Sequence, residues 1–137
     1  MTVSTLKGSC LCGAVTFAVT GEARRFYHCH CSRCRKATGT GHASNLFLQP
    51  GELVWLSGSD QVRAFKVPAA QRFTNSFCAT CGGRVPRQPA GTDVVMIPAG
   101  SLDAEPPMAP QARIFVDSRA AWSCADDALP TFREAPR

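Results

Sequence analysis

Cys29-His30-Cys31-Ser32-Arg33-Cys34 is the stretch that decides how this chain folds, because it gathers three thiols in a few residues. Two further clusters accompany it: a Cys-x-Cys pair at Cys10 and Cys12, and a Cys-x-x-Cys pair at Cys78 and Cys81. Seven of the eight cysteines therefore lie in three short clusters. Thiolates at this spacing can converge on one metal ion, and zinc takes four ligands. The sequence therefore predicts a fold built around zinc.

Spacing alone leaves two combinations of the clusters open. In the first, the two pairs form a closed four-thiolate site, which is structural, and the triplet keeps an open fourth position, which is the arrangement that supports chemistry. Gly82 and Gly83 make the second pair a strong metal-binding signal, because they permit the backbone that points amides at sulfur. In the second combination, the Cys-x-x-Cys pair joins the last two cysteines of the triplet, as in a zinc ribbon, and leaves Cys10, Cys12 and Cys29.

A zinc ion held by only three thiolates would be a weak activator of water, because the thiolates already supply electron density. Such a site suits a fourth thiolate, so we expect Cys29, Cys31 and Cys34 to act in catalysis as the ligands of an open zinc site that captures a thiol substrate. Basic residues flank this triplet and can recognise carboxylates of an anionic thiol, although each can also be a solvated surface charge. They are Arg24, Arg25, Arg33, Arg35 and Lys36, of which we assign Arg33, Arg35 and Lys36 to contacts with the thiol's carboxylates.

Three histidines and one further cysteine have less defined roles. His28 and His30 alternate with the cysteines and would face away from Cys29 on a strand, so we expect them to support the site or to be exposed. His42 is expected to be an ordinary strand histidine. Cys124 has no neighbouring cysteine and is expected to be a free thiol.

The bulk properties fit one soluble zinc protein. A length of 137 residues suits a single domain, and no apolar run approaches a membrane span of about 20 residues. The first residues show no secretory pattern, so we expect a cytoplasmic protein, in which clustered cysteines indicate metal ligands rather than the alternative, a disulfide framework. Seven thiolates and two zinc dications contribute minus three, which lowers the formal charge from +5 to +2 and weakens the argument for nucleic acid as a partner.

Short β-rich runs with Gly and Pro punctuation predict a mostly β fold. Ser32 is expected to cap a short helix over 33–38 that Gly39 ends, and Gly21 and Pro50-Gly51 are expected to form turns. A hairpin-like connection over 58–60 is expected to join two of the strands. From Ala104 onward the chain is proline-rich, and we expect its aromatics Trp122 and Phe132 to pack over the sheet. The expected strands are 14–20, 25–29, 42–48, 53–57, 62–67, 72–77 and 94–99.

These motifs together resemble the glutathione-dependent formaldehyde-activating enzyme family, which includes relatives of centromere protein V. The resemblance is carried by five segments: 8–15, 28–39, 77–83, 114–122 and 129–132. It implies a single domain over 1–137 with a β-tent-like fold of small antiparallel sheets, a core over about 8–103 and a C-terminal segment over 104–137. Many relatives have a histidine where this chain has Arg113, which is a departure from the family pattern.

The resemblance also implies the site and the reaction. It implies a structural zinc at Cys10, Cys12, Cys78 and Cys81 and a second zinc at Cys29, Cys31 and Cys34, where the sulfur of glutathione binds. The family reaction joins glutathione and formaldehyde to give S-hydroxymethylglutathione and is classed as a carbon–sulfur lyase. We therefore expect a zinc enzyme that acts on a small thiol and an aldehyde. The alternatives are a thiol carrier or sensor without turnover and, less favoured, a nucleic-acid-binding module.

Overall fold

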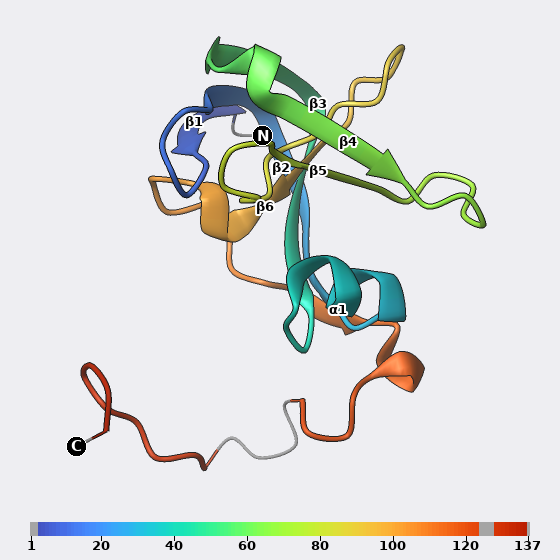
Figure 1. Ribbon diagram of the computed structural model, residues 1–137, viewed down its shortest axis with the longest axis vertical. Helices are drawn as coiled ribbons and strands as arrows, with labels where there is room; N and C mark the ends of the chain where they lie inside the picture. The colour runs from blue at the N-terminus through green and yellow to red at the C-terminus, as the bar shows by residue number, and fades with distance from the viewer. Residues whose placement is uncertain (1–2, 124–127, 137) are drawn as a thin grey trace.

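Two long antiparallel strands form the centre of the fold, which is described here from a computed structural model for residues 3–123 and 128–136. β1 pairs with β2 and β6 pairs with β3, both antiparallel, and β7 adds to β2 in parallel. β4 and β5 form a separate antiparallel sheet (Figure 1). The strands are β1 (Val3–Ser9), β2 (Thr16–Cys29), β3 (Ala43–Ser57), β4 (Val62–Lys66), β5 (Thr74–Cys78), β6 (Val95–Pro98) and β7 (Ala112–Ile114). The expectation of a mostly β fold of small sheets is confirmed.

One α-helix, α1 (Ser32–Thr38), lies at the end of the β2–β3 pair opposite to β4 (Figure 1). Its N-cap is Cys31 rather than the expected Ser32, because the Cys31 sulfur accepts the Cys34 N–H at 3.2 Å. Gly39 ends the helix in the left-handed conformation, as expected, with φ of 70°. Three short 3₁₀ turns complete the elements: η1 (Ser59–Gln61), η2 (Ala99–Ser101) and η3 (Val116–Ser118).

The glycines expected to form turns at Gly21 and Pro50-Gly51 instead lie inside β2 and β3. Gly21 pairs with Gly51 across the two strands, beside irregularities in the register. A Cβ on Gly21 would collide with the Pro50 carbonyl oxygen and lie 2.7 Å from Gly51 Cα. These glycines therefore allow two strands to approach closely where they bulge, which a sequence pattern does not distinguish from a turn.

One other expectation about the strands is wrong, and one strand was not expected. The expected hairpin around 58–60 does not form, because Gly58 leads with φ of 72° into η1 and the following β4 pairs with β5 rather than with β3. β1 was not expected from the sequence. It pairs with β2 along its whole length.

The apolar residues gather in one main core and two small clusters that contain the cysteines. The main core lies between β1, β2, β3 and β6 and comprises Leu6, Phe17, Val19, Phe26, Leu46, Leu48, Val95 and Ile97. The second cluster packs Cys10 and Cys78 with Val15 and Val85. The third packs Cys29 and Cys34 with Ala43. Both groups of cysteines are thus built into packed regions, which fixes their positions.

The C-terminal segment joins the fold through its backbone rather than through its aromatics. β7 pairs with the end of β2, and the Gln111 N–H donates to the Phe26 carbonyl at 2.7 Å. Trp122 and Phe132 are largely exposed, so the expected packing of these rings over the sheet is not seen. Cys124, expected to be a free thiol, lies outside the described residues. Among the helices described, none has the length and apolar character needed to cross a membrane.

Candidate functional site

The first cysteine group brings together two clusters that are far apart in the sequence. The sulfurs of Cys10, Cys12, Cys78 and Cys81 all lie within 4.8 Å of one another. The separations are 3.6 Å between the Cys10 and Cys12 sulfurs and 3.9 Å between those of Cys12 and Cys78. Sulfurs placed about 2.3 Å from a tetrahedral zinc ion would lie roughly 3.8 Å apart. These four residues therefore fit a closed four-thiolate metal site.

Backbone amides also prepare this group for thiolate charge. The Val15, Thr80 and Gly83 N–H groups donate to the Cys10, Cys78 and Cys81 sulfurs at 3.3, 3.4 and 3.4 Å. The Gly83 N–H, together with that of Cys12, lowers the pKa of Cys81 to about 6. At Cys10, burial opposes ionisation, but hydrogen bonds from the Val15 N–H and the Cys12 and Cys78 thiols lower the pKa on balance. Such hydrogen bonds are typical of metal-binding thiolates.

The second cysteine group has three members. Cys29 ends β2, Cys31 caps α1 and Cys34 lies in the first turn of α1, and their sulfurs are within 4.8 Å of one another. Burial alone would raise the pKa of Cys31, whereas the hydrogen bond from the Cys34 N–H lowers it. The net result is a lowered pKa. Burial raises the pKa of Cys29 and of Cys34. The site thus has one readily ionised thiol and two buried thiols that need a cation to become thiolates.

A cavity of about 570 Å³ opens beside this group of three. All three cysteines line it, whereas none of the other four clustered cysteines does. Its walls come from β2, β3, α1, β6, β7 and the segments around β5. The other residues that line it are Tyr27, Ser32, Arg33, Asn45, Phe47, Arg72, Phe73, Thr74, Arg84, Arg87, Pro89, Val94, Met96, Ile114, Phe115 and Ser118. The triplet therefore faces a space large enough for a small-molecule ligand.

Positive charge reaches this cavity mainly from residues that the sequence did not single out. Of the three basic residues expected to contact the ligand, Arg33 lines the cavity, whereas Arg35 and Lys36 do not. The additional cations are Arg72, Arg84 and Arg87. No acidic side chain is found among the lining residues described here. The sequence could have indicated Arg84, because this residue directly follows the glycines of the Cys78–Cys81 cluster.

The remaining basic residues that flank the triplet are used elsewhere. Arg24 pairs with Glu22 at 3.2 Å and donates to the Gln49 carbonyl. Arg25 lies over the Phe47 ring, with its guanidinium carbon 4.6 Å from the ring centroid. Neither arginine lines the cavity. Both guanidinium groups therefore make local contacts outside the cavity.

The three histidines gather away from the cavity. Alternation along β2 directs Tyr27 and Cys29 to the cavity and His28 to the other face. The His28 and His42 ring centroids are 4.1 Å apart, and His28 Nδ1 lies 2.9 Å from Ser44 Oγ. Burial, and then the nearby charge of His42, lowers the pKa of His28 and of His30. The lowered pKa values favour neutral rings at His28 and His30, and none of the three histidines lines the cavity.

Arg113, the departure from the family pattern, contacts this histidine group. Its Nη1 lies 3.3 Å from Nε2 of the fully buried His30. Arg113 occupies the β7 position paired with His28 and is absent from the cavity lining. Arg113 therefore contacts the histidines behind the cysteine loop and does not line the cavity.

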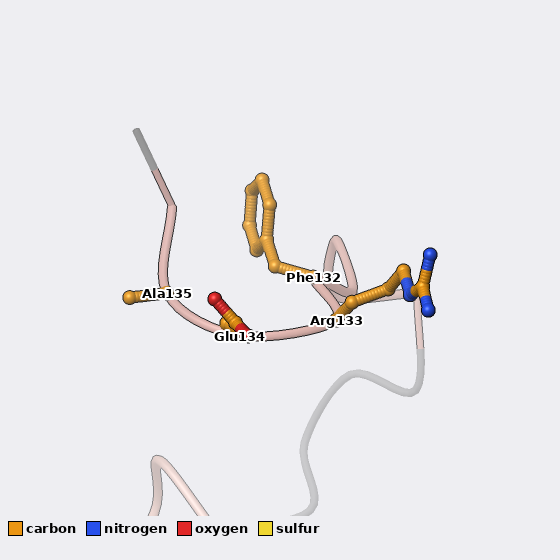
Figure 2. A pocket seen from close by; sticks show the side chains of 4 residues that line it. All are labelled: Phe132, Arg133, Glu134 and Ala135. Atoms are coloured by element: carbon orange, nitrogen blue, oxygen red, sulfur yellow. The ribbon is translucent and has the colours of Figure 1, made fainter.

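A different hollow lies in the C-terminal segment. Figure 2 shows that Phe132, Arg133, Glu134 and Ala135 line it. These residues are consecutive and include no cysteine. The cavity beside the cysteine triplet is therefore the candidate functional site.

Comparisons with known proteins match this chain to one family. A family model described as "Glutathione-dependent formaldehyde-activating enzyme" matches residues 5–118. A protein of Halomonas elongata, provisionally named a glutathione-dependent formaldehyde-activating enzyme, is 30% identical over 127 residues, which cover 85% of this chain and 78% of the relative. A crystal structure of a Rhodobacter sphaeroides protein superimposes with a TM-score of 0.51 at 21% identity, covering 79% of this chain and 99% of the other. The last likeness concerns the fold alone.

Proposed function

Because the chain belongs to the glutathione-dependent formaldehyde-activating enzyme family, we propose that it joins glutathione or a similar thiol to formaldehyde or another small aldehyde. One observation carries this proposal: a group of three cysteines opens onto a cavity whose described lining contains four arginines and no acid. The reaction would be that of a carbon–sulfur lyase. The thiol would carry carboxylates, as glutathione does, because four arginines and no acidic side chain are among the described lining residues.

We assign zinc to both cysteine groups. The group of four matches a closed site in number, separation and amide hydrogen bonds. The group of three would leave one coordination position open, and a zinc ion bound there would lower the pKa of a thiol and orient its sulfur. The ionised cysteines would also carry a net negative charge that the neighbouring arginines offset.

Arginines on facing walls would hold the carboxylates of the thiol. Arg33 comes from α1, whereas Arg84 and Arg87 come from the segment that follows β5. Arginine binds carboxylates through two parallel hydrogen bonds, which fixes orientation as well as charge. Since Arg35 and Lys36 lie outside the lining, we assign the carboxylate contacts to Arg33, Arg84 and Arg87.

The bond-forming step needs little from the protein beyond positioning. The sulfur lone pair forms the new bond to the carbonyl carbon, and the π pair of the carbonyl moves to oxygen. The proton that the thiol lost on ionisation returns to this oxygen through water, which gives the hydroxymethyl thioether without any oxidant. The protein would accelerate the reaction by holding the thiol ionised and by orienting the two reactants.

A thiol carrier or sensor is the second candidate, and one observation favours it. The described lining contains no histidine, aspartate or glutamate that could act as a general base. A carrier would bind the thiol in the same cavity without turnover. Glutathione binding with no acceleration of aldehyde addition would favour this function over the enzyme.

Exchange NMR with ¹³C-formaldehyde and glutathione tests the enzymatic proposal, because it measures interconversion at equilibrium against the uncatalysed rate. We expect the metal-loaded protein to accelerate exchange, and Cys31→Ser to remove this acceleration along with one metal ion. Acceleration that persists after loss of that metal would show that the triplet does not act as proposed.

A further inference from the structure

Asn45 is a buried amide at the cavity wall whose side-chain oxygen lacks a hydrogen-bond partner. The residue is 9% exposed. Its Oδ1 has no hydrogen-bond partner in the described part of the chain. Buried polar groups in folded proteins are almost always hydrogen-bonded. An amide that lines a cavity and has an unpaired oxygen therefore marks a place where the polar group of a ligand can bind.

The register of the two central strands brings Asn45 close to the cysteine group. Asn45 pairs with Tyr27, and the next pair on the same face joins Cys29 with Ala43. Asn45 and Cys29 are thus diagonal neighbours across an antiparallel pair, at a typical separation of about 7–8 Å. A thiol bound at the cysteine group would place its reacting sulfur on the face of the two strands that carries this amide.

From this position we propose that Asn45 binds the oxygen of the aldehyde during addition, an inference that rests on the proposed function. As sulfur bonds to the carbonyl carbon, the oxygen gains the π electrons, and the Asn45 N–H groups donate to it. Once that oxygen has taken up its proton, its hydroxyl donates to Asn45 Oδ1. An amide suits this exchange because it carries both donors and an acceptor and keeps its charge state.

Other polar groups in the cavity are less suited to this oxygen. The arginines only donate, so they cannot accept from the hydroxyl product. Ser32 and Ser118 are exposed, and the Thr74 hydroxyl donates to the Arg72 carbonyl at 3.0 Å. Tyr27 is the closest competitor, since it lies directly opposite Asn45, and the experiment therefore includes it.

The test compares Asn45→Leu, Asn45→Ser and Tyr27→Phe, each loaded with zinc. Glutathione affinity is measured by titration calorimetry and aldehyde addition by exchange NMR. We expect Asn45→Leu to lower kcat about 10- to 100-fold, as the loss of a hydrogen bond to a charged group would, while glutathione affinity changes by less than about twofold. Asn45→Ser, which keeps a hydroxyl, is expected to recover part of the rate. Tyr27→Phe is expected to retain it.

Gln88→Leu is the matched control, because Gln88 is an amide outside this cavity. Its side chain bonds the Leu53 N–H and the Gly51 carbonyl, each at 2.9 Å. We expect this variant to lose thermal stability but to keep kcat. An unchanged kcat in Asn45→Leu, or a loss found only in Tyr27→Phe, would overturn the assignment of Asn45.

A second readout separates this inference from the proposed function. The Asn45 side-chain amide is identified in ¹⁵N spectra as the resonance missing from Asn45→Leu. We expect it to shift when formaldehyde is added to the glutathione complex, beyond any shift caused by glutathione alone. If the wild-type protein shows no acceleration, the proposed function fails. If the amide resonance is unmoved by formaldehyde, the role of Asn45 fails.

Discussion

Arg84 Nε donates a hydrogen bond of 2.7 Å to Asn75 Oδ1, which holds the guanidinium at the wall of the cavity that contains Cys34. Arg84 directly follows Gly83, whose N–H donates to the Cys81 sulfur. Among the described residues, no carboxylate pairs with this guanidinium. The turn that forms the closed cysteine group therefore also positions a cation in the open one.

Arg84→Gln is expected to weaken glutathione binding about tenfold or more, because it removes a charged partner for a carboxylate while keeping polarity. Binding of 2-mercaptoethanol, which has no carboxylate, is expected to stay the same. Calorimetric titration of both thiols into the zinc-loaded protein measures the difference. An equal loss of affinity for the two thiols would show that Arg84 does not recognise the carboxylates of glutathione.

Arg63→Gln serves as the control for that measurement, since Arg63 lies on β4 outside the cavity and donates only to nearby carbonyls. It is expected to leave both affinities unchanged. Asn75→Ala is a complementary variant, because it removes the acceptor that orients Arg84. We expect it to reproduce part of the effect of Arg84→Gln.

Cys31→Ser is expected to remove one metal ion while preserving the fold. Serine is a preferred N-cap residue, so it can replace the Cys31 sulfur as acceptor of the Cys34 N–H and maintain the start of α1. Cys78→Ser is expected to lower the unfolding temperature much more, since Cys78 is fully buried and a serine hydroxyl is a poor replacement for a thiolate ligand in the closed site. Circular dichroism and metal analysis of both variants test the contrast. Similar unfolding of both would contradict it.

In the metal-free protein, Cys81 is expected to be alkylated fastest in its group near neutral pH. Its pKa is lowered to about 6, chiefly by the Gly83 N–H, so most of it is thiolate at pH 7. The pKa of Cys12 is raised to about 11, because its neighbouring thiols oppose its charge more than the Ala14 N–H favours it. Iodoacetamide labelling with peptide mapping from pH 5 to 9 measures both rates.

The direction of the pH effect follows from the lowered pKa of Cys81. Its labelling rate should rise as the pH increases through about 6. The same thiolate stabilises the folded metal-free protein above its ordinary pKa of 9.0, and this contribution is lost as the pH falls through about 6. Faster labelling of Cys12 than of Cys81 at pH 7 would contradict the assignment.

Gly21→Ala is expected to destabilise the protein by about 1–3 kcal/mol, because its methyl group would meet the backbone of β3 where two strands approach. Gly100→Ala is the control, since its Cβ would meet nothing within 4 Å. Urea unfolding of both variants measures the difference. Equal stabilities would argue against the close approach of β2 and β3 at this position.

The cysteine spacing predicted the metal-binding clusters, but it did not predict most of the residues that line the cavity beside the triplet. Short local patterns are visible in a sequence, so the clusters, the small helix and the mostly β character were all predicted. The grouping of Cys10 with Cys78 spans about half of the chain and was left open by spacing alone. The structure groups these residues because β1, β2 and β5 bring the two pairs to one packed cluster.

The residues that the sequence did not reveal are those placed by long-range pairing. Asn45 reaches the cavity only through its register with Tyr27, and Arg87 through its bridge to Met96 in β6. Sequence proximity instead pointed to Arg35 and Lys36, which lie on α1 but away from the cavity. The paired glycines of β2 and β3 resemble turn residues for the same reason, since their partners lie on another strand.

Native mass spectrometry of the zinc-loaded protein, with and without glutathione, tests most directly the claim of one closed and one open metal site. The account predicts two zinc ions per chain and one glutathione bound, with both the second zinc and the glutathione absent in Cys31→Ser. A single zinc ion in the wild-type protein, or glutathione binding that survives in Cys31→Ser, would contradict it.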